Sequence, residues 1–301
     1  MNTPLQCNPE VTGLSRRQWL TGTAAVCLGS SLLAGPAQAQ ELFDLDKVRA
    51  SGILKVALYK DNAPYSDGKG QDMTGVDAAL ALALATEMGL KLSLLPFDAG
   101  EKMDDDLRNM VWKGHYLGTQ PADLMMHVPV DTHLAKANDK VRIFGAYHRE
   151  ALGVARDTAR IPPFSGSAAV ALEIFTREKI GVETATLADS FLLGVLNGRL
   201  RENVVHFKSV AEAAQGLLRG EIAAVLAPRS ELEAALIGQS KIPVETANLS
   251  ELKVGGWPLG MAVKVEENEL ADAVGAALAD LKREGVVADI FKRHGITYQA
   301  A

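Results

Sequence analysis

Short apolar runs alternate with segments of helical periodicity in the first half of the chain. Residues 53–58 form an apolar run that predicts a strand, and residues 91–95 form a second one. Between them, an alanine- and leucine-rich segment at 75–88 predicts a helix, with Asp77 placed to cap its start and Gly89 to end it. Strands that alternate with helices in this way are typical of an α/β fold.

A third predicted strand leads into a polar loop. Residues 104–113 predict a helix that begins with carboxylates, and the short apolar run at 123–126 predicts a buried strand. In open α/β sheets, ligands collect just beyond the carboxyl ends of strands, so we expect ligand contacts there. The candidates are His127, Val128, Asp131 and His133. The alternative is that they are loop groups satisfied by water and by the backbone.

The C-terminal half contains further strands and two helices. Residues 151–155 and 258–263 predict short apolar strands, which could pair side by side across a hinge. Apolar residues then recur at helical spacing over 270–281 and over 287–291, with Gly285 between the two segments. We interpret these apolar stripes as core and assign them no function.

The segment 1–39 is predicted to be a secretory signal of the twin-arginine type. Paired arginines, Arg16 and Arg17, precede an apolar stretch at 20–33 and a small-x-small cleavage pattern at 37–39. A membrane anchor is the alternative, but the stretch contains Gly and Ser and is shorter than the roughly 20 residues of a membrane span. We therefore expect a periplasmic protein without a stable membrane anchor.

The composition of the expected mature chain excludes several kinds of site. Both cysteines, Cys7 and Cys27, lie in the signal, so we expect no disulfide, thiolate metal site or cysteine nucleophile. The formal net charge of −6 becomes −7 when Arg16, Arg17 and Glu10 are removed. This charge gives no reason to expect nucleic acid as a partner, and we expect a monomer.

Histidines are concentrated in one section of the chain, which raises the question of a metal site. Their spacing matches no helical ligand pair such as i, i+4, so we expect no metal centre and no cofactor. The dense carboxylate run at 104–106 is interpreted as a solvated helix start. The histidines in question are His115, His127, His133 and His148, and Asp131 lies in the same section of the chain.

The order and spacing of short motifs resemble family 3 periplasmic solute-binding proteins, which have the type II two-lobed fold. The match covers nearly the whole expected mature chain. The motifs are Pro64-Tyr65-Ser66, Gly75-Val76-Asp77, Ala122-Asp123-Leu124, Phe144-Gly145-Ala146-Tyr147, residues 181–186, residues 220–225 and residues 258–263.

This resemblance implies an α/β fold of two lobes with a ligand cleft between them, each lobe a mixed sheet flanked by helices. Lobe 1 would comprise residues 41–147 and 257–301, and lobe 2 residues 149–255. Ligand would favour the closed state because only that state contacts it from both lobes.

Two departures from the family pattern bear on the ligand. In the amino-acid binders of this family an arginine holds the ligand's carboxylate, and Ala135 occupies that position here. An acidic residue that usually receives the ligand's ammonium is expected after the strand at 223–226, where the chain reads Ala-Pro-Arg-Ser and includes Arg229. We therefore predict that free α-amino acids are not the ligand.

Several candidate ligand contacts remain in the expected cleft. Tyr65 would be an aromatic platform, and free amides at the helix start near Thr186 would suit an anionic or carbonyl group. The alternative for Thr186 is ordinary helix capping with Asp189. For Arg149 the alternative to a ligand contact is an ion pair with Glu150. The full candidate set adds Tyr59, Asn62, Glu183, Thr184 and Arg229 to the residues already named.

A narrower resemblance covers residues 107–110 and 122–129. These are similar to the corresponding section of binding proteins associated with quinoprotein methanol dehydrogenases, the MxaJ/XoxJ-like group. Such proteins serve a dehydrogenase as an accessory partner or cofactor handler. Pyrroloquinoline quinone, a planar polyanion, would suit a cleft with tyrosines and arginines.

Three function classes follow from these resemblances. The leading hypothesis is a solute-binding protein that closes on a small polar, anionic, non-amino-acid ligand and delivers it to an ABC permease. The second is an accessory or cofactor-binding protein of a quinoprotein alcohol dehydrogenase. The third is a periplasmic dehydratase on the same fold, with Glu183, Asp131 or His127 as general acid or base. No catalytic pair is evident from spacing, so we expect no enzyme.

Overall fold

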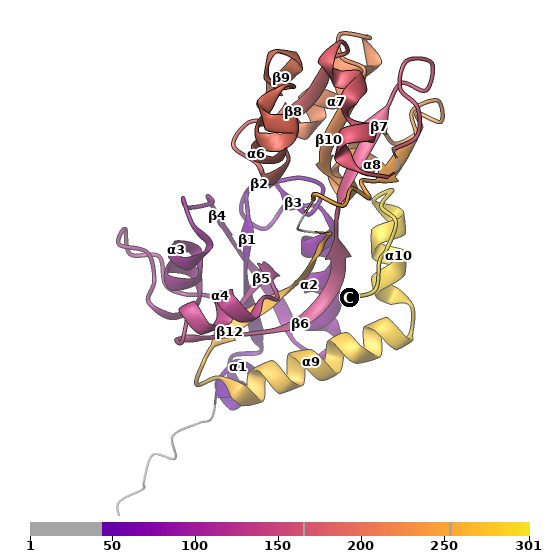
Figure 1. Cartoon of the computed structure of the whole chain (residues 1–301). Coiled ribbons are helices and arrows are strands. Elements are labelled where there is room, and N and C mark those ends of the chain that lie inside the picture. The colour runs from indigo at the N-terminus through magenta and orange to yellow at the C-terminus, as the bar shows by residue number, and fades with distance from the viewer. Residues whose placement is uncertain (1–43, 165, 253–254) are drawn as a thin grey trace, which may run out of the picture. The chain divides into compact units, whose positions relative to one another are not determined.

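The computed structural model describes residues 44–164, 166–252 and 255–301 (Figure 1). The predicted signal at 1–39 lies outside these ranges. Within them the chain forms two five-stranded mixed sheets and one small two-stranded sheet. None of the helices in the described ranges is long and apolar enough to cross a membrane.

The first sheet, which with its helices we call lobe 1, has the strand order β4-β1-β5-β12-β6. Strand β1 is parallel to β4 and β5, whereas β12 is antiparallel to β5 and β6. The bounds are β4 Lys91–Phe97, β1 Ile53–Tyr59, β5 Leu124–Pro129, β12 Trp257–Lys264 and β6 Val141–Glu150.

The second sheet, which with its helices we call lobe 2, has the order β11-β7-β10-β8-β9. Strand β8 is parallel to β9 and β10, and β7 is antiparallel to β10 and β11. The bounds are β11 Val244–Thr246, β7 Leu152–Arg156, β10 Ala224–Pro228, β8 Ile180–Glu183 and β9 Val204–Phe207.

The predicted pairing of residues 151–155 with residues 258–263 is wrong. Strand β7 pairs within lobe 2, whereas β12 inserts between β5 and β6 of lobe 1. Both runs are strands as predicted, but apolar patterning does not specify which partner a buried strand takes. The chain passes from one sheet to the other between Glu150, the last residue of β6, and Leu152, the first residue of β7.

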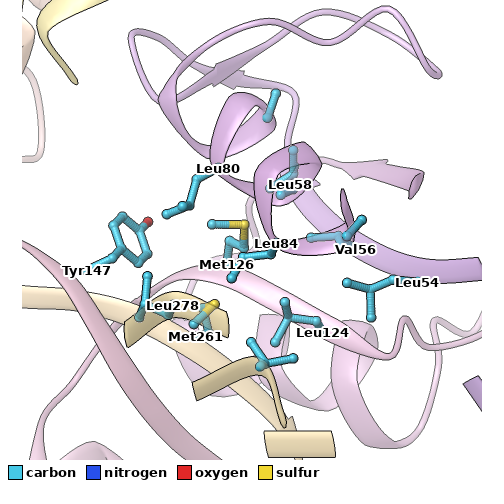
Figure 2. Packing of buried hydrophobic residues seen from close by; sticks show 14 of the residues in the cluster. Leu54, Val56, Leu58, Leu80, Leu84, Leu124, Met126, Tyr147, Met261 and Leu278 are labelled. Atoms are coloured by element: carbon cyan, nitrogen blue, oxygen red, sulfur yellow. The ribbon is translucent and has the colours of Figure 1, made fainter. Parts of the chain in front are cut away.

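Alternate residues of β1 pack on opposite faces of the lobe 1 sheet, as the period of two in a strand requires. Leu54, Val56 and Leu58 enter the core cluster under the helices, and Ala57 and Tyr59 enter the cluster on the other face. Figure 2 shows the first three in one cluster with Leu80 and Leu84 of α2 (Val76–Glu87). Burial of each such large side chain contributes about 1.5–3 kcal/mol.

Helices α2, α9 and α10 cover one face of this sheet, and the predicted C-terminal helices are confirmed. The opposite face packs on α3 and a following π-helical turn. The bounds are α1 Asp44–Ser51, α2 Val76–Glu87, α3 Met103–Leu107, the π turn Arg108–Trp112, α4 Thr132–Ala137, α9 Asn268–Arg283 and α10 Val286–Arg293.

The lobe 2 sheet is likewise covered on both faces. Helices α5 and α6 pack against one core cluster, and α7 and α8 against the other. The bounds are α5 Ala168–Ala171, α6 Leu187–Gly194, α7 Val210–Leu218 and α8 Arg229–Ala235, with 3-10 turns at Glu173–Thr176, Val195–Gly198 and Arg201–Asn203.

Two local predictions in lobe 1 need correction. Asp77 does not cap α2, because Gly75 is the N-cap residue and no side chain bonds to the helix start. The predicted helix at 104–113 is α-helical only to Leu107 and continues as a π turn. Asp106 there is buried and accepts hydrogen bonds from Tyr59 and Gly100, so this part of the run is not a solvated face.

Candidate functional site

A cleft of about 630 Å³ is lined by residues of both lobes. Lobe 1 contributes the hairpin of β2 (Asp61–Asn62) and β3 (Ser66–Asp67), which follows β1. Lobe 2 contributes residues beyond the carboxyl ends of β8 and β9 and residues of α8, where an α/β sheet is expected to bind ligands. The lining residues are Asp61, Asn62, Ala63, Pro64, Asp67, Glu183, Thr186, Ser209, Val210, Ala211, Glu231, Ala234 and Ala235.

The cleft is acidic. Its charged lining residues are Asp61, Asp67, Glu183 and Glu231, and no Lys, Arg or His is among the described residues that line it. Burial raises the pKa of Glu231 to about 8, and the nearby charges of Glu183 and Glu150 add to the effect. Burial also raises the pKa of Glu183, partly offset by the Val210 amide. Among the described residues none of the four lining carboxylates forms an ion pair.

Tyr65 is not the aromatic platform that the sequence suggested. Its side chain is buried in lobe 1, with the residue 2% exposed, and its hydroxyl donates to Glu150 Oε2 at 2.6 Å. Tyr59 is also mostly buried and donates to Asp106 Oδ2 at 2.8 Å. Burial raises the pKa of both phenols above the usual value. Neither ring lines the cleft.

Asn62 is the predicted loop residue that does line the cleft. It also lines a neighbouring cavity of about 280 Å³ beside Tyr59, Asp61 and Asp98. Its Nδ2 atom is buried and has no hydrogen-bond partner among the described residues. A buried donor without an acceptor in the protein is rare, and a water or a ligand at this place would satisfy it.

Val128 and His127 lie inside β5 rather than beyond its end. Val128 is 0% exposed in the core under α3, so the prediction that it contacts ligand is wrong for this structure. Strand β5 continues past the predicted run at 123–126 to Pro129, and His127 within it has a φ of 62°, where the pairing of β5 with β12 shifts register. The His127 ring turns inward, with Nδ1 3.0 Å from Asp77 Oδ2, and does not line the cleft.

Asp131 and His133 have local roles at α4. The Asp131 carboxylate accepts from the backbone N–H groups of His133 and Leu134 and so caps the helix. His133 is exposed on that helix, and neither residue lines the cleft. No group of three or more potential metal-ligating side chains occurs in the described parts of the chain.

Thr186, at the start of the helix that follows β8, both caps that helix and lines the cleft. Thr186 Oγ1 accepts from the Asp189 amide, and the Asp189 carboxylate accepts from the Ala185 amide. This reciprocal pair is the capping arrangement that the sequence left open. Thr186 also lines the cleft beside Glu183, whereas the Thr184 hydroxyl donates to the Phe207 carbonyl and lies outside the lining.

The arginines do not supply positive charge to the cleft. Arg149 and Arg229 line a separate cavity of about 180 Å³. The Arg229 guanidinium is 2.8 Å from Glu233 and donates to Thr246. The proposed pair of Arg149 with Glu150 is absent among the described contacts, because the Glu150 carboxylate accepts from Tyr65 and from backbone amides instead.

A buried polar network lies where the two sheets meet. In lobe 1, Tyr147 donates to Asp77 Oδ1 at 2.6 Å. The Glu150 carboxylate accepts from Tyr65 and from the amide of Ser230 at the start of α8. Burial lowers the pKa of the adjacent His148 to about 4, so this ring is neutral at physiological pH. The network links a lobe 1 strand to a lobe 2 helix without an exposed charge.

Sequence reasoning missed Asp61, Asp67, Ser209 and Glu231. Asp61 is adjacent to the predicted Asn62, and Glu231 lies two residues beyond the predicted Arg229. Ser209 carries a helix-start signal, since it precedes α7 and caps it. What the pattern could not show is that the lobe 1 hairpin and three segments of lobe 2 line one space.

Comparison with known proteins gives a match in structure but not in sequence. No family model matches the chain, and no curated protein matches it. An ancestral cationic amino acid solute-binding protein has a TM-score of 0.65 and 21% identity, covering 83% of this chain and 99% of that chain. A second structure of it is described as a precursor of cyclohexadienyl dehydratase.

Two bacterial structures are similar in the same way. A polar amino acid ABC uptake transporter substrate-binding protein from Streptococcus thermophilus has a TM-score of 0.64 and 14% identity, covering 87% of this chain and 93% of that chain. An amino acid ABC transporter substrate-binding protein from Streptococcus pneumoniae, bound to L-arginine, has a TM-score of 0.56 and 18% identity, covering 86% and 100%. At these identities the likeness concerns the fold. The chain has the α/β two-lobed periplasmic binding protein fold, with mixed sheets flanked by helices.

Proposed function

We propose that this protein is a periplasmic solute-binding protein, exported by the signal at 1–39, that closes its lobes over a small polar ligand. The closed form then presents the ligand to a membrane permease of an ABC-type uptake system. The division predicted from the sequence, with residues 41–147 and 257–301 in lobe 1 and residues 149–255 in lobe 2, is part of this proposal, and its first crossing is moved to follow Glu150, the last residue of β6. Ligand contacts from both lobes would stabilise the closed state by the difference in affinity between the two states.

The observation that carries this proposal is the cleft of about 630 Å³ with lining residues from both sheets. Its size suits a small molecule. The hydroxyls of Thr186 and Ser209 and the Asn62 amide give it hydrogen-bonding groups beside the carboxylates. The three similar proteins, whose names describe solute or substrate binding, support the same role.

The proposed ligand is not a free α-amino acid. Ala135 cannot clamp a carboxylate, and the described lining contains no basic side chain that would replace the missing arginine. The same absence argues against the anionic ligand that the sequence suggested, because an anion would face four carboxylates. The arginines on which that expectation depended lie in another cavity.

The quinoprotein accessory role is a weaker hypothesis for the same reason. Pyrroloquinoline quinone carries several carboxylates, which the acidic lining would repel. Its predicted tyrosine platforms, Tyr59 and Tyr65, are buried within lobe 1. What remains in its favour is the local similarity at residues 107–110 and 122–129.

A dehydratase is the second candidate function, and Glu231 is the observation that favours it. With a pKa of about 8, this carboxyl holds a proton at neutral pH and could act as a general acid. Glu183 lies close enough to perturb it. The acidic lining disfavours a carboxylate substrate, so we rank this function below binding.

Native mass spectrometry of the protein purified from its own periplasm tests the leading proposal. We expect a retained small molecule, and small-angle scattering should show compaction when that molecule is added back to protein freed of ligand. Absence of any ligand, with no compaction on a broad metabolite panel, would refute a binding function. Turnover of prephenate to an aromatic product by the wild-type protein, lost in Glu231→Gln, would favour the dehydratase instead.

A further inference from the structure

We infer that the cleft takes a linear aliphatic diamine without a carboxylate, with one ammonium group near the lobe 1 hairpin and the other near the lobe 2 carboxylates. This inference rests on the proposed binding function and specifies its ligand class. It follows from three features of the lining: paired acids on each lobe, an apolar surface on lobe 2, and the absence of a basic group among the described lining residues.

The lobe 1 acids are held directly opposite each other. Asp61 and Asp67 are register partners in the antiparallel β2–β3 hairpin, and both line the cleft. Like charges at such a cross-strand position repel each other. Neither forms an ion pair among the described residues, so an ammonium group between them would relieve the repulsion. This geometry is independent of the acids on lobe 2.

The lobe 2 acids are partly buried. The Glu231 side chain makes no hydrogen bond or ion pair in the described part of the chain, and burial raises its pKa to about 8. Glu183 lines the same space and contributes to that shift. A carboxyl that is withdrawn from water without a partner is costly when ionised, and a ligand ammonium would replace the proton it otherwise holds.

An apolar surface lies on the lobe 2 side of the cleft. Val210 and Ala211 at the start of α7 and Ala234 and Ala235 at the end of α8 line it. Methylene groups of an aliphatic spacer would bury against these side chains, each contributing favourable transfer free energy. Charge at both ends with an apolar middle matches an alkyl diamine better than a compact cation.

A carboxylate on the ligand would make binding in this cleft unfavourable. It would enter a space that contains four acids and whose described lining has no Lys, Arg or His to pair with it. The lining hydroxyls and the Asn62 amide can donate hydrogen bonds but supply no charge. The cleft should therefore discriminate between an amino acid and its decarboxylated amine, which differ only in that group.

Isothermal titration with matched pairs tests the inference on ligand-free mature protein. The probes are putrescine against ornithine and cadaverine against lysine, with glutamate and a neutral sugar as further ligands. We expect at least one diamine to bind, at least tenfold more tightly than its parent amino acid. Small-angle scattering with that diamine should show compaction of the protein.

Variants on each lobe locate the two ends of the ligand. Glu231→Gln and Asp67→Asn should each weaken diamine binding at least fivefold. Glu267→Gln is the matched control, because burial also raises the pKa of Glu267, to about 7, but that residue lies at the start of α9 outside the cleft. It should leave diamine affinity unchanged.

The outcomes separate this inference from the proposed function. Equal or tighter binding of ornithine or lysine would overturn the diamine inference and retain the binding function. Binding of only glutamate or the sugar would do the same. If no probe in the panel binds, the inference is refuted, and retention of some other molecule in native mass spectrometry would then decide the function.

Discussion

Replacing Glu231 by glutamine should change how the stability of the protein depends on pH. Burial raises the pKa of this carboxyl from 4.5 to about 8 in the folded protein. In the unfolded chain it returns to the lower value. Between these two pKa values the folded state keeps a proton that the unfolded state releases, so wild-type stability falls as pH rises through this window and levels off above it.

The size of this effect follows from the two pKa values. They differ by about 3.5, and at about 1.36 kcal/mol for each pKa unit the full penalty above pH 8 is roughly 5 kcal/mol. Glu231 is only partly shielded from solvent at the cleft, so we expect about 2–3 kcal/mol. Glu231→Gln removes the ionisation and keeps the shape, and should therefore be more stable than wild type by that amount at pH 9.

Urea unfolding followed by circular dichroism at pH 5, 7 and 9 measures the difference. The advantage of Glu231→Gln should be largest at pH 9 and close to zero at pH 5. Glu87→Gln, at the exposed end of α2, is the control and should track wild type at all three values. A Glu231→Gln curve parallel to wild type from pH 5 to 9 would refute the argument that this carboxyl is buried without a partner.

Four further substitutions test the packing of lobe 1. Gly75→Ala should destabilise the protein by about 1–3 kcal/mol, because at a φ of 118° the added Cβ would lie 2.3 Å from the Tyr65 carbonyl oxygen. Gly275→Ala should instead stabilise the protein by about 0.5–1 kcal/mol, since the added Cβ would meet open space inside α9. The melting temperatures of these two variants must move in opposite directions. Phe291→Ala should lower the free energy of unfolding in urea by about 3–5 kcal/mol, since this fully buried ring stacks on the His148 ring with centroids 4.4 Å apart. A loss below about 1 kcal/mol would mean that α10 does not pack as described. Tyr147→Phe should lose about 1–3 kcal/mol in urea unfolding, because Asp77 Oδ1 is left without its donor. A double-mutant cycle with Asp77→Ala, which removes the acceptor, measures the coupling. An equal cost of Tyr147→Phe in wild type and in the Asp77→Ala background would contradict a direct interaction.

Part of the site was accessible from the sequence because it depends on local signals. Glu183 ends β8, Thr186 caps the helix that follows, and Asn62 comes shortly after β1, so all three are at positions where ligands collect. The absence of an arginine at Ala135 was also visible. This absence is consistent with the described lining of the cleft, which contains no basic side chain.

Other side chains were misplaced because burial is decided at long range. Tyr65, Tyr59 and Val128 follow or end strands in the sequence, yet packing against lobe 1 helices and neighbouring strands withdraws them from the cleft. Arg229 follows β10 as expected, but Glu233 one helical turn later draws its guanidinium away. No local pattern distinguishes such residues from those that remain in the cleft.

The sequence by itself determined the elements: β1, the two C-terminal helices and the stop between them at Gly285. These depend on apolar period and on turn chemistry, which act over a few residues. The tertiary structure alone decided that β12 inserts between β5 and β6, and that Asp61, Asp67, Glu183 and Glu231 face one cleft. The partners of a strand and the net charge of a cleft depend on residues that are over a hundred positions apart in the sequence. The charges of such residues act on one site only once the chain has folded.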